Sequence, residues 1–209
     1  MEFVDKFMDS YWDVAKDIDF NSKKLQLSIF FVVFNPLYWN FGARLEYNTK
    51  LLSKLAFGSK LLAVYLFSVS VFTLGLIRDH VYKEAILEQP TSPLLDVPLV
   101  KALGVLSFGV GSVFVSSSMY KLGIVGTYLG DHFGFLKDER ITDFPFSVLD
   151  NPMYDGSTLC FLGTALWYGK ASGIFISGLV YAMYQLVELL EEPFTAKIYQ
   201  KREEQKKVK

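Results

Sequence analysis

The stretch LLAVYLFSVSVFTLGLI, residues 61–77, decides the class of fold, because it is predominantly apolar and contains no charged residue. Lys60 and Arg78 flank it, and their long side chains are expected to snorkel toward the two membrane surfaces. A second uncharged stretch, ALGVLSFGVGSVFVSSSMY at residues 102–120, also lies between basic residues. Stretches of this length and composition predict membrane-spanning helices.

Two further apolar regions extend this pattern. Residues 25–43, LQLSIFFVVFNPLYWNFGA, are uncharged but interrupted by Asn35-Pro36, which predicts a kinked or re-entrant element. Residues 156–169 and 171–187, separated by Lys170, predict a helical hairpin whose second arm runs on into the C-terminal tail. The sequence therefore predicts an all-α, polytopic membrane helical bundle with about four to five membrane-embedded helices.

The composition agrees with a membrane protein and excludes several other classes. Of 209 residues, 51% are hydrophobic and 16% aromatic, and the net charge of −1 gives no basic surface for nucleic acid. Cys160 is the single cysteine, which excludes an intramolecular disulfide and a CxxC metal site. Two histidines, His80 and His132, are too few for a usual zinc centre, so we expect no metal. The N-terminus lacks the basic and apolar parts of a cleaved signal, so internal segments must direct insertion.

The distribution of charge suggests how the chain is divided. Residues 1–24 form a polar N-terminal segment, and residues 25–209 are expected to form a single membrane-embedded domain. Within it, residues 121–155 are polar yet rich in aromatic residues and glycines, which predicts a folded, interfacial catalytic region. Residues 200–209 form a basic tail that we expect to be cytosolic.

Positive charge near the spans predicts the orientation of the chain. The loop at residues 44–60 carries more basic residues than the loop that follows residue 77, so it should be cytosolic. Counting crossings then returns residues 121–155 and the C-terminus to the cytosol. The last four residues, Lys206 to Lys209, resemble a dilysine retrieval signal of endoplasmic-reticulum membrane proteins. We therefore expect a multi-pass protein of the endoplasmic-reticulum membrane.

Acidic residues concentrate where the last apolar segment ends, in LVELLEEPF at residues 186–194. Glu188, Glu191 and Glu192 are spaced to share one side of a helix, and like charges this close repel. Something must offset this repulsion, such as a cation bound between the carboxylates. Pro193 should kink the helix at this point. An acidic helix end at the membrane surface would show the same pattern, so both interpretations stay open.

Three other motifs admit both a functional and a structural interpretation. Gly109-Val110-Gly111 lets another backbone or a ligand approach the second span closely, but small residues at such spacing also serve helix packing. Asn151-Pro152 initiates a turn ahead of the hairpin, as an ordinary loop would. Asp131-His132 offers two adjacent groups that can accept a proton near neutral pH, or a structural hydrogen bond.

Four motifs in order carry a resemblance that covers nearly the whole chain from about Asn35. They are FNPLYWN at residues 34–40, GTYLGDHFG at 126–134, FPFSVLDNPMYDGS at 144–157 and EEPFTAKIY at 191–199. With them the sequence closely resembles the small phosphatidylethanolamine N-methyltransferase family. Its size is similar to that of the fungal-type members, which methylate phosphatidyl-N-methylethanolamine onward to phosphatidylcholine.

This resemblance implies S-adenosyl-L-methionine as the methyl donor. Carboxylates at a membrane-surface pocket suit a donor that carries a sulfonium and an ammonium. The substrate amine must lose a proton before it attacks the methyl group, and Asp131 or His132 is the predicted base. The predicted donor site comprises Gly109, Val110, Gly111, Asn151, Tyr154, Glu191 and Glu192.

Aromatic side chains are the natural partners of the methylated headgroup, because a quaternary ammonium no longer donates hydrogen bonds. Trp39, Tyr128 and Tyr154 are the candidate walls, although aromatic residues at a membrane interface look the same in sequence. The expected partners are therefore a phospholipid substrate and the membrane, while the oligomeric state stays open.

A more distant similarity, to isoprenylcysteine carboxyl methyltransferases, implies a related core. Their turn usually begins with Arg-His, whereas this chain has Asp150-Asn151, so contacts of that histidine are not carried over. Two alternatives follow for the function. One is a membrane methyltransferase that acts on another lipidated substrate, such as a prenylcysteine carboxyl, and the other is a non-catalytic membrane scaffold.

Overall fold

The computed structural model describes residues 16–139 and 141–207, and that part of the chain is helical and contains no strand. The elements follow the apolar stretches of the sequence, with polar connections between them. In chain order they are α2 (Lys23–Thr49), α3 (Leu51–Leu55), α4 (Lys60–Glu88), α5 (Pro98–Thr127), the 3-10 helix η1 (Gly130–Phe133), α6 (Pro152–Tyr168) and α7 (Ala171–Lys207).

Local chemistry explains where several helices begin and end. Ser22 caps α2 by accepting a hydrogen bond from the backbone N–H of Leu25, at 3.3 Å, and Ser59 caps α4 in the same way. Gly169 stands between α6 and α7 with a φ of 62°, a backbone conformation that glycine adopts without strain. These residues turn the chain sharply, so the long helices lie side by side.

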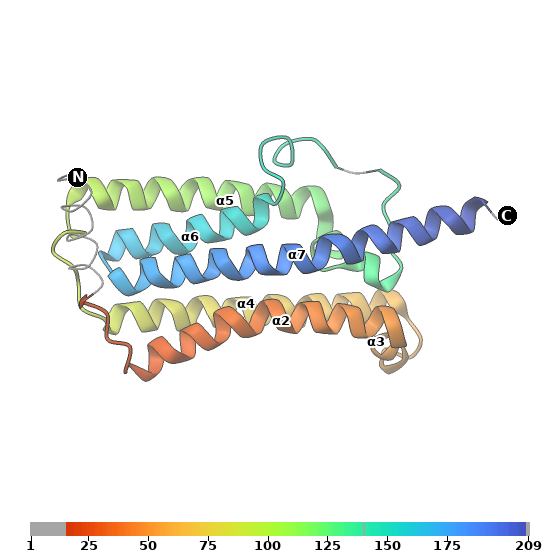
Figure 1. Ribbon diagram of the computed structural model, residues 1–209, viewed down its shortest axis with the longest axis horizontal. Coiled ribbons are helices and arrows are strands. Elements are labelled where there is room, and N and C mark those ends of the chain that lie inside the picture. The colour runs from red at the N-terminus through yellow and green to blue at the C-terminus, as the bar shows by residue number, and fades with distance from the viewer. Residues whose placement is uncertain (1–15, 140, 208–209) are drawn as a thin grey trace.

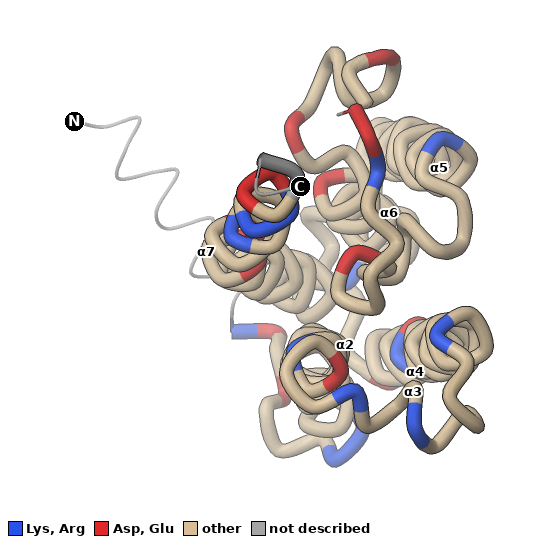
Figure 2. Tube along the Cα trace, turned by 90° about the vertical axis from the view of Figure 1, so that its right-hand side faces the viewer, with Lys and Arg blue, Asp and Glu red and all other residues tan. Residues whose placement is uncertain are grey.

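The five long helices form an elongated bundle (Figure 1). Seen down its length, α2 lies beside α4, α5 lies beside α6, and α7 packs between the two pairs (Figure 2). Three helices, α4, α5 and α7, are long and apolar enough to cross a membrane. The predicted all-α membrane bundle is therefore confirmed, as is the helical hairpin, which is formed by α6 and α7.

The first apolar element is one continuous helix and not a re-entrant loop. α2 runs through Pro36 to Thr49, and its two halves differ in direction in Figure 1. A kink is expected there because proline cannot donate the helical hydrogen bond and crowds the preceding turn. The side chain of Asn35 donates to the backbone carbonyl of Leu74, at 3.0 Å, and so fastens this point of α2 to α4.

Glycines let α5 and α6 approach at backbone contact. A Cβ atom added to Gly111 would lie 2.4 Å from the carbonyl oxygen of Gly156, and one added to Gly104 would lie 2.8 Å from that of Gly163. Distances this short leave no room for any side chain. This pair of helices is therefore packed through small residues, as membrane helices often are.

The polar connections predicted to be cytosolic gather at one end of the bundle. α3, η1 and the end of α7 all lie there, on the right in Figure 1. The guanidinium of Arg202 donates to the carbonyl of Lys137 at 2.9 Å, and the N–H of Lys137 donates to the hydroxyl of Tyr199 at 3.2 Å. Residues 200–207 thus continue α7 and do not hang free, while the dilysine-like signal lies partly outside the described residues.

Two basic residues are buried in the bundle, and one of them is placed differently from the sequence-based expectation. Arg78 was predicted to snorkel at the end of a span, but this was wrong, because α4 continues to Glu88 and Arg78 is only 8% exposed. Lys170 separates the arms of the hairpin and is 7% exposed. Its ammonium donates to the carbonyl of Gln89 at 2.6 Å and the hydroxyl of Thr91 at 2.9 Å, which ties the hairpin turn to the end of α4.

Candidate functional site

A cavity of about 350 Å³ lies inside the bundle, with α4 and α5 on two sides and α2, α6 and α7 closing it. Its volume falls in the range of about 300–1,000 Å³ that is usual for small-molecule sites. Most of the exposed area of its wall is apolar, although several polar side chains also line it. Those polar residues are Asn35, Trp39, Arg78, Asp79, Thr127, Tyr128, Asn151, Tyr154, Ser157, Tyr184 and Glu191.

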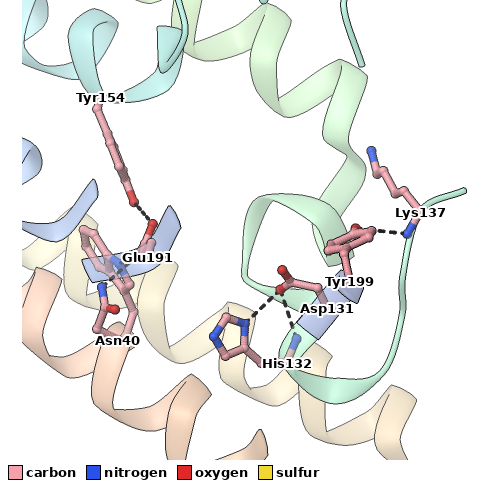
Figure 3. Close-up of polar contacts among 8 residues, drawn as sticks. Asn40, Asp131, His132, Lys137, Tyr154, Glu191 and Tyr199 are labelled. Atoms are coloured by element: carbon pink, nitrogen blue, oxygen red, sulfur yellow. Dashed lines mark hydrogen bonds and ion pairs between the residues drawn. The ribbon is translucent and has the colours of Figure 1, made fainter. Parts of the chain in front are cut away.

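Glu191 is one of two acidic residues on this wall, with Asp79, and three helices hold it in place. Its Oε1 accepts hydrogen bonds from Trp39 Nε1 at 2.9 Å and from Asn40 Nδ2 at 2.7 Å, both on α2. Its Oε2 accepts from the hydroxyl of Tyr154 on α6, at 2.8 Å (Figure 3). Three donors from two other helices fix the position of the carboxylate before any ligand arrives.

The structure separates the acidic residues that the sequence groups together. Glu192 is exposed and does not line the cavity. Glu188 accepts a hydrogen bond from Asn151 Nδ2 at the start of α6, so the predicted turn residue does reach the acidic helix end. Neighbouring positions on a helix point about 100° apart, and for that reason only one member of the pair Glu191-Glu192 faces the cavity.

The helix α7 continues through Pro193 without a break. Proline leaves the carbonyl of the residue four positions earlier without its helical donor. Next to this gap, Arg44 of α2 donates to the carbonyl of Leu190 at 2.6 Å. This contact joins α2 to α7 on the turn that carries Glu191.

Aromatic rings form a stack beside Glu191. The ring of Tyr154 lies 4.6 Å from that of Tyr184 at an interplanar angle of 10°, and 6.4 Å from that of Trp39 at 21°. Tyr128 also lines the cavity. All three aromatic residues that the sequence suggested as walls, Trp39, Tyr128 and Tyr154, therefore lie at the cavity, and Tyr184 joins them.

A guanidinium faces the same space. Arg78 Nη1 donates to the hydroxyl of Tyr184 at 2.8 Å, while its Nε and Nη2 contact Asp79 Oδ1 at 3.0 Å and 2.9 Å. The hydroxyl of Tyr184 also contacts Ser157 Oγ at 3.1 Å. Sequence analysis missed Tyr184 because it sits in an uninterrupted apolar arm, where nothing distinguishes it from a core residue.

Two buried oxygens on the cavity wall have no hydrogen-bond partner among the described residues. They are Asn35 Oδ1 on α2 and Thr127 Oγ1 at the end of α5. Leaving a buried polar atom without a partner costs about 1–3 kcal/mol. Their position therefore suits a ligand that brings hydrogen-bond donors.

The glycine motif in α5 lies away from the cavity. Atoms of α6 fill the space that a side chain at Gly111 would need, whereas a Cβ atom added to Gly109 would meet nothing within 4 Å. Val110 is 40% exposed. None of the three residues lines the cavity, so the geometry favours the packing interpretation for Gly111 and gives no support to a donor contact by this motif.

Asp131 and His132 contact each other but do not reach the cavity wall. Asp131 Oδ1 lies 2.9 Å from His132 Nδ1 and also accepts from the backbone N–H of His132 at 2.9 Å. Figure 3 shows this contact with Asp131, and the imidazole, which is 2% exposed, also stacks on Phe194 at 5.1 Å and meets the edge of Tyr47. The predicted role as a direct base therefore has no geometric support.

These features define a helical membrane protein whose bundle contains a cavity of small-molecule size lined by aromatic and charged side chains. The family model described as phospholipid methyltransferase matches residues 99–202, which include α5, α6, most of α7 and Glu191. The chain belongs to the phospholipid methyltransferase family.

Named relatives cover most of the chain. Phosphatidyl-N-methylethanolamine N-methyltransferase of Saccharomyces cerevisiae is 51% identical over 91% of this chain and 92% of its own length. The protein of the same name in Schizosaccharomyces pombe is 53% identical over 82% of this chain and 88% of its own length. Human phosphatidylethanolamine N-methyltransferase is 47% identical over 82% of this chain and 85% of its own length.

No solved structure matches this chain. The predicted likeness of its core to isoprenylcysteine carboxyl methyltransferases therefore stays a prediction.

Proposed function

We propose that this protein transfers methyl groups from S-adenosyl-L-methionine to the headgroup amine of a phospholipid. Its acceptors are phosphatidyl-N-methylethanolamine and the dimethylated form, and its product is phosphatidylcholine. Family membership and the names of the fungal relatives support this choice of substrate. Three helices that can cross a membrane support an acceptor that resides in the bilayer.

The observation that carries the proposal is the carboxylate of Glu191, fixed by three hydrogen bonds on the wall of an otherwise largely apolar cavity. A carboxylate in apolar surroundings is costly unless it offsets a positive charge. When bound, S-adenosyl-L-methionine supplies an electrophilic methyl group on a positively charged sulfonium. Its amino and hydroxyl groups are also the kind of donors that Asn35 Oδ1 and Thr127 Oγ1 lack.

The residues that we assign to the donor are Glu191, through its charge, and Trp39 and Tyr154, through their aromatic faces. Asn151, at the start of α6, contributes indirectly by donating a hydrogen bond to Glu188. We do not extend the assignment to Gly109, Val110, Gly111 or Glu192, because none of them lines the cavity.

The acceptor amine reacts only as the free base, so its ammonium must lose a proton before attack. Moving the amine out of bulk water favours the neutral form over the charged one, with the proton released to the water outside the cavity. As methyl groups accumulate, the ring faces of Tyr154 and Tyr184 can still hold the headgroup, since cation–π attraction needs no N–H donor.

We also propose that the end of the bundle that carries α3, η1 and the end of α7 faces the cytosol, in the endoplasmic-reticulum membrane. Glu191 lies in the half of α7 nearer this end, so a water-soluble donor would enter from the cytosol. The richer positive charge of residues 44–60 supports this orientation.

A lipid-product assay tests the proposal. Microsomes that contain the expressed protein are incubated with methyl-labelled S-adenosyl-L-methionine and, separately, the unmethylated, monomethylated and dimethylated phospholipids and a prenylcysteine acceptor. We expect labelled phosphatidylcholine from the monomethylated and dimethylated lipids. Absence of labelled lipid in all arms contradicts the proposal, and label in the prenylcysteine arm alone indicates the related methyltransferase class.

A further inference from the structure

Arg78 is a buried cation on the cavity wall. It directly follows the uncharged run of residues 61–77 and is only 8% exposed, although α4 continues for ten residues beyond it. Among the described residues that line the cavity, it is the only lysine or arginine. Burying a charge is costly unless an opposite charge or a ligand pairs with it.

The contacts of Arg78 leave part of its guanidinium free for a ligand. A guanidinium has five N–H donors, and the contacts to Asp79 and Tyr184 use three of them. Within the described residues, one hydrogen on each terminal nitrogen is thus left over. The side chain of Asp79 is 53% exposed, so this ion pair is open toward the cavity and is not sealed in the core.

We infer that Arg78 binds the phosphodiester group of the lipid substrate, an inference that rests on the proposed function. The planar fork of arginine matches two phosphate oxygens and adds charge attraction to the hydrogen bonds. Because Arg78 itself is only 8% exposed, this attraction is stronger than at a protein surface.

The arrangement of the cavity matches the two charges of the headgroup. Its ammonium and phosphate are separated by two carbons, and in the cavity a line of contacts joins Arg78 to Glu191. Arg78 donates to the hydroxyl of Tyr184, whose ring stacks on Tyr154, and Tyr154 donates to Glu191. A phosphate at Arg78 therefore places the amine over the tyrosine stack, on the side where Glu191 would hold the cationic donor.

The apolar wall next to Arg78 favours a lipid over the carboxylate of the methyl donor. Phe72 and Leu76 of α4 line the cavity and are also 49% and 54% exposed on the outside of the bundle. Met119 and Leu122 of α5 line the facing wall. Acyl chains attached to a phosphate at Arg78 can leave between these helices into the bilayer, whereas the donor has no apolar tails to place there.

The test measures the two substrates separately with the full-length protein in mixed micelles. For Arg78→Gln we expect the KM for phosphatidyl-N-methylethanolamine to rise about tenfold or more, because a hydrogen-bonded charge is lost. The KM for S-adenosyl-L-methionine should stay within about twofold. For Arg78→Lys we expect a lipid KM between those of the wild-type protein and Arg78→Gln, because lysine keeps the charge but lacks the planar guanidinium. Lys101→Gln is the matched control, because Lys101 pairs with Asp96 outside the cavity.

A binding measurement keeps the test independent of turnover. Glycerophospho-N-methylethanolamine should raise the unfolding temperature of the wild-type protein, and N-methylethanolamine, which lacks the phosphodiester, should raise it less. Arg78→Gln should abolish this difference. If the wild-type protein methylates no lipid, the proposed function fails, while this comparison still decides whether Arg78 binds the phosphodiester.

Two results overturn the inference. One is an unchanged lipid KM in folded Arg78→Gln, which makes Arg78 a structural tie between α4 and α7. The other is a raised KM for S-adenosyl-L-methionine with the lipid KM unchanged, which assigns the guanidinium to the donor carboxylate. If Arg78→Gln does not fold, the same two outcomes are read from Arg78→Lys.

Discussion

Glu191 and Glu192 are identical side chains on adjacent positions of α7, and their surroundings differ completely. Glu191 accepts from Trp39, Asn40 and Tyr154, whereas Glu192 is exposed. The helical turn between neighbouring residues is the cause, because it points the two carboxylates in different directions. At this scale the environment, and not the residue type, determines which carboxylate can serve a cationic ligand.

This contrast gives a matched pair of variants. We expect Glu191→Gln to raise the Kd of S-adenosyl-L-methionine about tenfold or more, because the charge that offsets the sulfonium is lost. Glu192→Gln should raise it by a clearly smaller factor. Equilibrium binding of the labelled donor to purified protein measures both. An equal rise in this Kd for the two variants would contradict the assignment of donor binding to Glu191 and not to Glu192.

A substitution of His132 tests whether the buried Asp131–His132 pair takes part in the reaction although it does not line the cavity. Its ring contacts Asp131 and stacks on Phe194, away from the cavity wall. We therefore expect His132→Asn to lower kcat by less than about tenfold, whereas loss of a direct base costs about 10²–10⁴-fold. The pH profile of kcat, measured alongside, should keep its shape. A larger loss with a changed profile would restore His132 as the base.

At the scale of elements, glycines and prolines have different effects from those that local rules suggest. Pro36 and Pro193 both lie inside continuous helices, because contacts with neighbouring helices hold the turns around them. Gly104 and Gly111 face Gly163 and Gly156, so α5 and α6 touch backbone to backbone. The same Gly109-Val110-Gly111 motif thus contains one glycine that is required for packing and one that faces open space.

A second matched pair follows from this difference. Gly111→Ala should destabilise the protein by about 1–3 kcal/mol, as overpacking does, because its Cβ would meet the carbonyl of Gly156 at 2.4 Å. Gly109→Ala has free space and should not lower the unfolding temperature, because alanine favours a helix over glycine. Thermal unfolding in detergent reports the stability and donor binding reports the site. Weakened donor binding in a stable Gly109→Ala protein would show that the motif contacts the donor.

At the scale of the whole molecule, the bundle has two unlike ends. One end carries α3, η1 and the extension of α7, and the other carries the residue 89–97 connection and the α6–α7 turn (Figure 1). Glu191 lies nearer the first end along α7, while Arg78 lies nearer the second along α4. In the orientation that we propose, the cavity joins the cytosolic end of the bundle with its membrane-embedded part.

The orientation can be measured with single cysteines in a Cys160→Ser background. Lys54→Cys and Gln200→Cys, at exposed positions of the first end, should react with a membrane-impermeant maleimide in intact, cytosolic-side-out microsomes. Leu94→Cys, which is exposed at the other end, should react only after detergent is added. Labelling of Leu94→Cys in intact vesicles would reverse the proposed orientation.

Much of the fold could be predicted because membrane insertion depends on local composition. The uncharged stretches at residues 61–77 and 102–120 lie within α4 and α5, and the hairpin at residues 156–187 is formed by α6 and α7. An apolar run long enough to cross the bilayer must satisfy its backbone internally, so a helix follows from the run itself. The ends of the helices were harder to predict. α4 continues past Arg78 because residues of other helices, such as Tyr184, provide hydrogen-bond partners there.

The sequence by itself determined the helical membrane architecture, the order of the helices and the family, since these follow from composition and from motifs that are contiguous in the chain. It also marked Glu191, Tyr154 and Trp39 as candidates. Only the tertiary structure decided which carboxylate faces the cavity and that Gly111 packs against α6. It also decided that Asp131 and His132 do not line the cavity, and that Arg78 contacts Tyr184 on its wall. Those outcomes depend on the rotation and crossing of helices far apart in sequence, which side-chain packing between helices sets and local spacing does not reveal.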